Sequence, residues 1–201
     1  MSVTKTQTGI VEPAKDTCPL FIVCQKNLDR WLDSLPKAQQ NWVRETALPA
    51  KAGTCITLPS TNGHISAAAL ITDKNLIWES AGAASRLPAG SWAADLTFAG
   101  EADLSKIQLG WGLAQYHFAP HRPEKDPNNK AQLALAKTDQ DRGVHAQLKG
   151  IHIAREMINQ PANKMTPQGI ETAAKEIAQT YSAKVRGKTL PLLKKPAKDG
   201  R

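Results

Sequence analysis

The chain has 201 residues, of which 41% are hydrophobic, enough to bury the core of one large domain. No apolar run approaches the roughly 18 to 20 residues that cross a bilayer, and the amino terminus lacks the apolar centre of a signal peptide. We therefore expect a cytoplasmic location and no membrane partner. Three cysteines, Cys18, Cys24 and Cys55, are too few and too scattered for a disulfide framework or a zinc knuckle, so we expect buried or half-buried thiols.

The formal net charge of +8 lies in the last two fifths of the chain. Residues 1–120 contain 10 basic and 10 acidic side chains, whereas residues 121–201 contain 16 and 8. Much of the excess falls in a lysine-rich tail at the carboxyl end, and short basic tails are usually solvated. The tryptophans all lie in the neutral part, which disfavours a stacking surface for nucleic acids. They are Trp31, Trp42, Trp78, Trp92 and Trp111.

Strand-like and helix-like segments alternate over the first 120 residues. The predicted strands are residues 18–25, 53–60, 64–73 and 94–99, with 75–80 as a possible edge strand. The predicted helices are residues 27–35 and 103–118. Asn62-Gly63 marks a hairpin turn between the second and third strands. This order predicts one α/β domain with a small, partly parallel sheet flanked by helices.

Two glycines, Gly110 and Gly112, lie inside the helix predicted over residues 103–118. A glycine in a helix interior costs about 1 kcal/mol relative to alanine, so each needs a compensating reason. We expect close packing against a neighbouring element, in preference to a phosphate-binding loop.

Two further amphipathic helices are predicted after a stretch rich in proline and asparagine. The first covers residues 139–158, and the second covers residues 166–182. Between them, Pro161 and Pro167 restrict the residues that precede them, while Thr166 is a good N-cap for the second helix. Apolar stripes on both helices need a partner surface, so we predict self-association or poor solubility for the chain alone.

No constellation of residues assembles an active site. His117 and His121 are separated by Pro120, which breaks the helix that would place them on one face, and His145 and His152 have no matching carboxylate. We therefore expect the last two to be surface or interdomain histidines. The sequence Gly-Lys-Thr at 187–189 lacks the first glycine of a P-loop, and no serine lies in a nucleophile elbow.

Three stretches together resemble the leucyl (cytosol) aminopeptidase family of metallopeptidases: residues 109–122, residues 154–167 and the helix that follows. The most specific is the Asn-x-Pro-Ala-Asn-x-Met-Thr-Pro motif. It consists of Asn159, Pro161, Ala162, Asn163, Met165, Thr166 and Pro167. The resemblance implies that this motif is the structural junction between an amino-terminal α/β domain, macro-domain-like in fold, and a carboxy-terminal catalytic domain.

The same resemblance implies a homohexameric enzyme that removes amino-terminal residues from peptides, using two divalent metals, zinc or manganese. The family's metal-ligand signatures and its catalytic lysine and arginine do not occur in this sequence, so no catalytic or metal-binding residue is assigned and no bound cofactor is expected. The implied organisation is an amino-terminal extension (1–17), an α/β domain (18–120), a linker (121–138), an interdomain helix with the start of a catalytic domain (139–186) and a basic non-family tail (187–201).

Three functional hypotheses follow. The chain is the amino-terminal, non-catalytic part of a leucyl aminopeptidase, truncated or frame-shifted and inactive alone. Alternatively, it is a deliberately short, stand-alone interaction module that docks through its two last helices, on full-length subunits or on another protein. In the third hypothesis the basic tail binds nucleic acid, which the distribution of tryptophans disfavours.

Overall fold

The structure, a computed structural model, describes residues 8–118 and 130–186. These residues fall into two compact units, the first covering residues 8–118 and 130–156 and the second covering residues 157–186. The predictions for Gly-Lys-Thr at 187–189, for the basic tail and for His121 lie outside the described residues.

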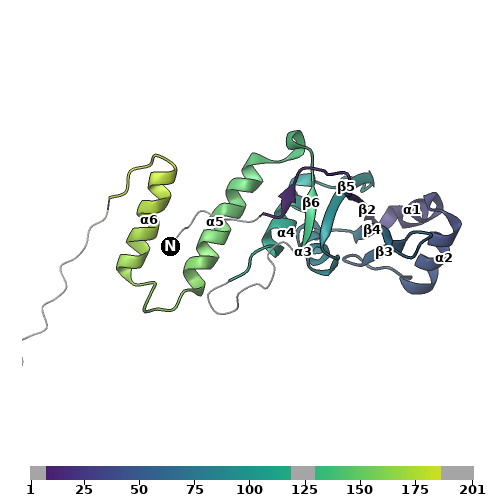
Figure 1. The fold of residues 1–201 in the computed structure, drawn as a ribbon, viewed down its shortest axis with the longest axis horizontal. Coiled ribbons are helices and arrows are strands. Elements are labelled where there is room, and N and C mark those ends of the chain that lie inside the picture. The colour runs from purple at the N-terminus through teal and green to yellow at the C-terminus, as the bar shows by residue number, and fades with distance from the viewer. Residues whose placement is uncertain (1–7, 119–129, 187–201) are drawn as a thin grey trace, which may run out of the picture. The chain divides into compact units, whose positions relative to one another are not determined.

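One six-stranded sheet forms the centre of the first unit, in the order β1-β6-β5-β2-β4-β3 (Figure 1). Five strands run parallel, and β3 alone is antiparallel because it forms a hairpin with β4. The strands are β1 (Ile10–Val11), β2 (Cys18–Cys24), β3 (Cys55–Pro59), β4 (Ile65–Thr72), β5 (Gly90–Phe98) and β6 (Ala131–Ala134). The predicted hairpin and mixed sheet are confirmed.

Helices cover both faces of this sheet. Those of the first unit are α1 (Leu28–Ser34), α2 (Lys37–Thr46), α3 (Leu76–Arg86), α4 (Leu104–Ala114) and most of α5 (Arg142–Asn159). Two 3-10 turns, η1 (Gln25–Asn27) and η2 (Lys137–Asp139), precede α1 and α5. The second unit contains α6 (Pro167–Thr180). Pro36 follows the end of α1, and α2 begins directly after it.

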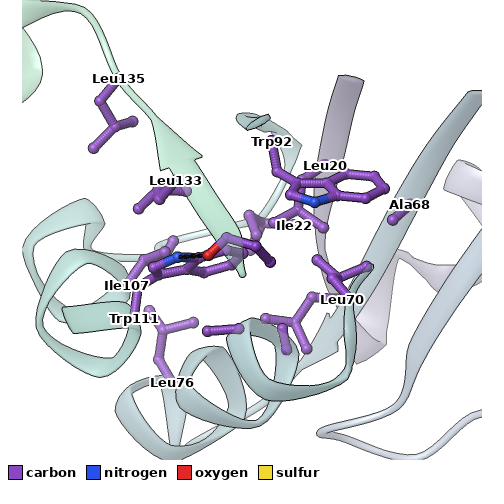
Figure 2. Close-up of a cluster of buried hydrophobic side chains, with 14 of the residues drawn as sticks. Leu20, Ile22, Ala68, Leu70, Leu76, Trp92, Ile107, Trp111, Leu133 and Leu135 are labelled. Carbon is purple, nitrogen blue, oxygen red and sulfur yellow. Dashed lines mark hydrogen bonds between the residues drawn. The ribbon is translucent and has the colours of Figure 1, made fainter. Parts of the chain in front are cut away.

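Two hydrophobic clusters, one on each face of the sheet, make the unit a three-layer α/β domain. Successive residues of a strand point to opposite faces, so Leu20 and Ile22 of β2 pack under α3 and α4, while Val23 packs under α1 and α2. In the first cluster, the indole Nε1 of Trp111 donates a hydrogen bond of 3.2 Å to the carbonyl of Ala131 in β6 (Figure 2). The predicted fold class is confirmed.

The prediction of an edge strand at residues 75–80 is wrong, because this segment begins α3. Its buried positions, Leu76, Ser80, Ala83 and Ala84, recur at helical spacing that a six-residue window does not reveal. The buried Glu79 carboxylate also accepts hydrogen bonds from backbone N–H groups in the loop that precedes the helix.

Three predicted boundaries also differ from the structure. Residues 131–134, assigned to the linker, form β6 between β5 and β1, and residues 10–11 of the assigned extension form the edge strand β1. Both strands are too short to show an alternating pattern. Helix α4 ends at Ala114 rather than at Phe118, and the side chain of Gln115 turns back to bond the carbonyl of Ala131.

Close packing at Gly110 is confirmed. A Cβ atom at this position would overlap the carbonyl oxygen of Ile77 and the hydroxyl of Ser80, so only glycine lets α4 approach the backbone of α3 this closely. The three cysteines are free and half-buried, as predicted. Within the described residues, no helix is both long enough and apolar enough to cross a membrane.

Candidate interdomain junction

The amino-terminal ends of α4 and α5 are joined through one serine. Asp103 caps α4 by accepting a 2.9 Å hydrogen bond from the backbone N–H of Ser105, whose hydroxyl donates to Oδ2 of Asp141 at 2.8 Å. Asp141 caps α5 in turn, because its Oδ1 accepts from the N–H groups of Gly143 at 2.7 Å and Val144 at 3.3 Å. These hydrogen bonds, led by that from Ser105, lower the pKa of the Asp141 carboxyl.

Gln108, which is buried within α4, fixes the segment that leads into α5. Its Nε2 donates to the carbonyl of Asp139 at 2.9 Å, and its Oε1 accepts from the backbone N–H of Asp141 at 3.0 Å. Both the N–H and the oxygen of this buried amide are thereby hydrogen-bonded. Loss of the Gln108 side chain would leave its two backbone partners unpaired. The start of α5 is therefore attached to the start of α4.

The middle of the contact is apolar. Leu148 of α5 is fully buried, and it occupies the space that a side chain at Gly112 of α4 would need. A Cβ at Gly112 would overlap Cδ1 of Leu148 and lie 2.7 Å from its Cδ2. Val144, one turn earlier on α5, is also buried. The predicted close packing at Gly112 is confirmed, and α5 is the neighbour.

At the carboxyl end of α4, two side chains of α5 bond backbone carbonyls. Nε2 of His152 lies 3.1 Å from the carbonyl oxygen of Gly112, and Nη1 of Arg155 donates to that of Leu113 at 3.0 Å. Carbonyls in the last turn of a helix lack a full set of helical partners, and the bond from Arg155 supplies one for Leu113. The carbonyl of Gly112 also accepts from the backbone N–H of Gln115 at 3.2 Å. Because a carbonyl accepts and does not donate, the proton of neutral His152 resides on Nε2.

The aromatic ring of Tyr116 completes this end of the contact. It lies 5.4 Å from the His152 ring, with 52° between their planes, and 5.5 Å from the Arg155 guanidinium. Its hydroxyl donates to Oε2 of Glu156 at 3.3 Å. We call the side chains of Tyr116, His152, Arg155 and Glu156 the latch. Together with the amino-terminal bonds, the latch holds α5 along α4 in the same chain direction.

Burial lowers the pKa of His152, and the charge of Arg155 lowers it further, against the opposing effect of the bond to the Gly112 carbonyl. The expectation of a surface or interdomain histidine is wrong for His152, because it is buried within the first unit. His145, two turns earlier on α5, is half-buried. Sequence spacing placed both on one helix and could not show which of them faces α4.

The predicted junction motif lies in the second unit, between the end of α5 and the start of α6. Asn159 is the last residue of α5, and the carbonyl of Pro161 accepts from the N–H groups of Lys164 at 2.8 Å and Met165 at 3.0 Å, which closes a turn. Thr166 caps α6 as predicted, since its hydroxyl oxygen accepts from the N–H of Gly169 at 3.2 Å.

The remaining motif residues act through the backbone of this connection. Pro167 occupies the first turn of α6, where a missing N–H costs nothing. Ala162 and Asn163 lie exposed in the turn.

Along α6, Ala173 and Ala178 of the predicted stripe are buried, whereas Ile170 is 49% and Tyr181 58% exposed.

The residues present do not make a divalent-metal site. Within residues 8–118 and 130–186, no three His, Cys, Asp or Glu side chains lie close enough to hold one ion. The buried acid, Glu79, is engaged by backbone N–H groups, and Cys55 is a poor thiolate ligand because burial raises its pKa to about 11.

The sequence profile of the family described as "M17 aminopeptidase, N-terminal domain" matches residues 18–136. The chain belongs to this family. The match begins at β2 and ends after β6, so it covers the sheet with the exception of β1 and stops short of α5. No curated protein matches the chain.

Solved structures agree with this assignment. A cytosol aminopeptidase from Coxiella burnetii is 27% identical, with a TM-score of 0.77, over 90% of this chain and 39% of that one. The bottromycin maturation enzyme BotP shares the fold at 17% identity and a TM-score of 0.57, over 83% of this chain and 38% of that one. A second BotP structure, in complex with Mn, has 19% identity and a TM-score of 0.56, over 84% and 37%. The chain thus spans about two fifths of the length of these proteins.

Sequence reasoning missed the polar residues of the α4–α5 contact. The residues concerned are Ser105, Gln108, Tyr116, Asp141, His152 and Arg155. One signal was available, since Gln108 interrupts the apolar positions of α4, and a polar residue there requires a buried partner. The partner itself could not be identified, because it lies 31 to 33 residues further along the chain.

Proposed function

We propose that this chain is the non-catalytic, amino-terminal part of a leucyl-type aminopeptidase, and that its task is to carry and orient the segment that leads into the catalytic part. The family assignment and the likeness to the cytosol aminopeptidase support this role. The observation that carries the proposal is the α4–α5 contact, which attaches α5 to the matched domain at both ends.

In this proposal the two-metal centre, zinc or manganese, and the groups that cleave the peptide belong to the portion of the relatives that this chain does not span. The chain's own residues have positioning roles. Ser105, Gln108 and Leu148 fix the start and middle of α5, and the latch fixes its later turns. The motif from Asn159 to Pro167 then acts as the interdomain junction, ending one helix and starting the next.

The proposed organisation keeps the α/β domain of residues 18–120 and adds β6 and α5 to it. Residues 157–186 form the start of the catalytic part. In the cell, we propose a cytoplasmic protein whose partners are further copies of the chain or full-length subunits in a homohexamer. Light scattering of the purified chain, with and without a full-length family member, measures both forms of association.

A peptidase assay tests the proposal directly. The purified chain is incubated with leucyl-p-nitroanilide and Mn²⁺, beside a full-length cytosol aminopeptidase as the positive control, after circular dichroism has established that the chain is folded. We expect release of p-nitroaniline by the control and none by the folded chain. Release that depends on Mn²⁺, is abolished by a chelator and accompanies the binding of two ions per chain would overturn the proposal.

A stand-alone interaction module is the second candidate. Ile170 on α6 and Tyr181, which follows its last residue, are large side chains with about half of their surface exposed, which suits a docking face. If docking is the function, Ile170→Glu abolishes association with full-length subunits while the unfolding midpoint of the chain stays unchanged. Unaltered association of this variant rules the module out.

A further inference from the structure

His152 is a buried, titratable side chain that the proposed positioning role does not require to be a histidine. Only 7% of its surface is exposed, and Nε2 is 3.1 Å from the carbonyl oxygen of Gly112. An asparagine or glutamine amide could donate the same hydrogen bond without a titration near neutral pH. The difference between histidine and these residues is its response to acid.

The charged side chains of α5 around the ring include two positive charges and one carboxylate. Arg155, one turn away on α5, adds a positive charge, and its guanidinium lies over Tyr116, the same ring that His152 contacts. Glu156 is the nearest carboxylate on α5, and the Tyr116 hydroxyl already donates to it. Lys149, on the preceding turn, is exposed and also positive.

Helix α4 supplies the acceptor and no carboxylate. Its one ionisable residue, Lys106, lies near the amino-terminal end, six residues before Gly112. The carbonyls of its last turn favour a nearby positive charge, which partly offsets burial. The net effect of burial, Arg155 and the carbonyl is a lowered pKa for His152.

We propose that protonation of His152 is an acid-operated release of the latch, which detaches the last turns of α5 from the carboxyl end of α4. An exposed imidazole takes up a proton more readily than the buried one does, so acid favours the open state in which the ring reaches water. Release at this end leaves the amino-terminal bonds through Ser105 and Gln108 intact. Protonation of His152 therefore loosens the carboxyl-terminal part of α5 and does not change the sheet.

The direction of the pH effect follows from the linkage between proton binding and the opening of the latch. A histidine with a lowered pKa in the closed state stabilises that state fully above its pKa in the open state, about 6.5. This stabilisation is lost as the pH falls from there through the pKa of the closed state. Each pH unit between the two pKa values corresponds to about a tenfold change in the opening equilibrium.

Two measurements on the full chain test the proposal. In the first, an NMR titration follows the imidazole Cε1–H signal of His152, which is identified by its loss in His152→Gln. In the second, hydrogen-exchange protection factors of the amides of residues 149–156 are determined at pH 7.5 and pH 5.0. We expect His152 to titrate below the ordinary histidine pKa of about 6.5, and these protection factors to fall several-fold at pH 5.0 while those of β2 stay constant.

His152→Gln keeps a donor and removes the titration, so its protection factors stay constant between the two pH values. The matched control, His64→Gln, retains the acid response of the parent chain. A titration midpoint of His152 at or above about 6.5, or protection of residues 149–156 that is the same at both pH values in the parent chain, would overturn the proposal. Both results are measured on the parent chain.

Discussion

Helices α5 and α6 carry apolar stripes of similar clarity in the sequence, yet they lie in different environments. The stripe of α5 begins with Val144 and Leu148, which are buried against the domain. The stripe of α6 is covered at Ala173 and Ala178, while Ile170 and Tyr181 remain about half exposed. An apolar period thus shows that a helix needs a partner, but it does not show whether the partner lies in the same domain.

Polar contacts separate the two helices further. Helix α5 is attached to α4 by hydrogen bonds from Ser105, Gln108, His152 and Arg155, at both of its ends. For α6, the structure gives the Thr166 cap and an ion pair on its own surface, where Nζ of Lys175 lies 2.7 Å from Oε1 of Glu171, four residues earlier. The first helix is therefore an integral part of the α/β domain.

The largest contrast is expected between two truncations of apolar side chains. Leu148→Ala removes a fully buried side chain from the α4–α5 contact and should lower the free energy of unfolding by about 2–5 kcal/mol. Ile170→Ala on α6 removes a half-exposed one and should change it by less than about 1 kcal/mol. Urea unfolding followed by circular dichroism measures both. Equal losses would show that the two helices are buried alike.

Two glycines on the facing helices should respond in opposite directions to alanine. Gly112→Ala places a methyl group against Leu148 and should destabilise the chain by about 1–3 kcal/mol. Gly150→Ala on α5 meets no atom within 4 Å and should stabilise it by about 0.5–1 kcal/mol, because alanine is the better helix former. Thermal melts of the two variants check the pair, and a stabilising Gly112→Ala would contradict the packing described.

The buried amide at Gln108 should matter more than an exposed one on α5. Gln108→Ala leaves the carbonyl of Asp139 and the N–H of Asp141 without their partner, which should cost about 1–3 kcal/mol. The control, Gln147→Ala, removes an exposed amide from α5 and should change the stability by less than about 0.5 kcal/mol. Denaturant midpoints that shift equally in both variants would argue against a fixed start of α5.

The smallest effect is expected at the cap of α5. The lowered pKa of Asp141 means that its ionised form stabilises the folded chain above its unfolded pKa, about 3.9, and that this contribution is lost as the pH falls through the folded value. Asp141→Asn keeps an acceptor and removes the titration. Its unfolding free energy should therefore fall less steeply below pH 4 than that of the parent chain, and identical slopes would rule out the proposed cap energetics.

The sequence predicted the α/β class, the hairpin, the close approach of Gly110 and Gly112, and the cap and start of α6. Each of these depends on local chemistry, such as a turn dipeptide, a helical glycine or a threonine before proline. Prediction from the sequence failed where short segments are stabilised by residues that are distant along the chain. Strand β1 exists because it pairs with β6, and β6 because it pairs with both β1 and β5. Helix α3 was misread because the six residues considered cover less than two turns of it, too few to show its helical period.

The candidate site was predicted only in part, for the same reason. The motif from Asn159 to Pro167 is visible in the sequence because proline and threonine act on their immediate neighbours. The side chains that fix α5 could not be recognised in the sequence, because Gly112, Tyr116 and His152 meet across roughly 40 residues of chain. Which face of an amphipathic helix meets which neighbour is decided by tertiary packing.

The attachment of α5 to the domain is tested most directly by comparing chains that end at different residues. A chain that ends at Glu156 retains the first unit, whereas one that ends at Asp141 lacks α5 and exposes the surface around Gly112, which Leu148 contacts. Urea unfolding should give the same free energy for residues 1–156 as for the sheet domain of the full chain. It should give a value lower by several kcal/mol for residues 1–141, on the scale of about 2–5 kcal/mol for each large buried side chain. Equal stability of the two shortened chains would contradict the account.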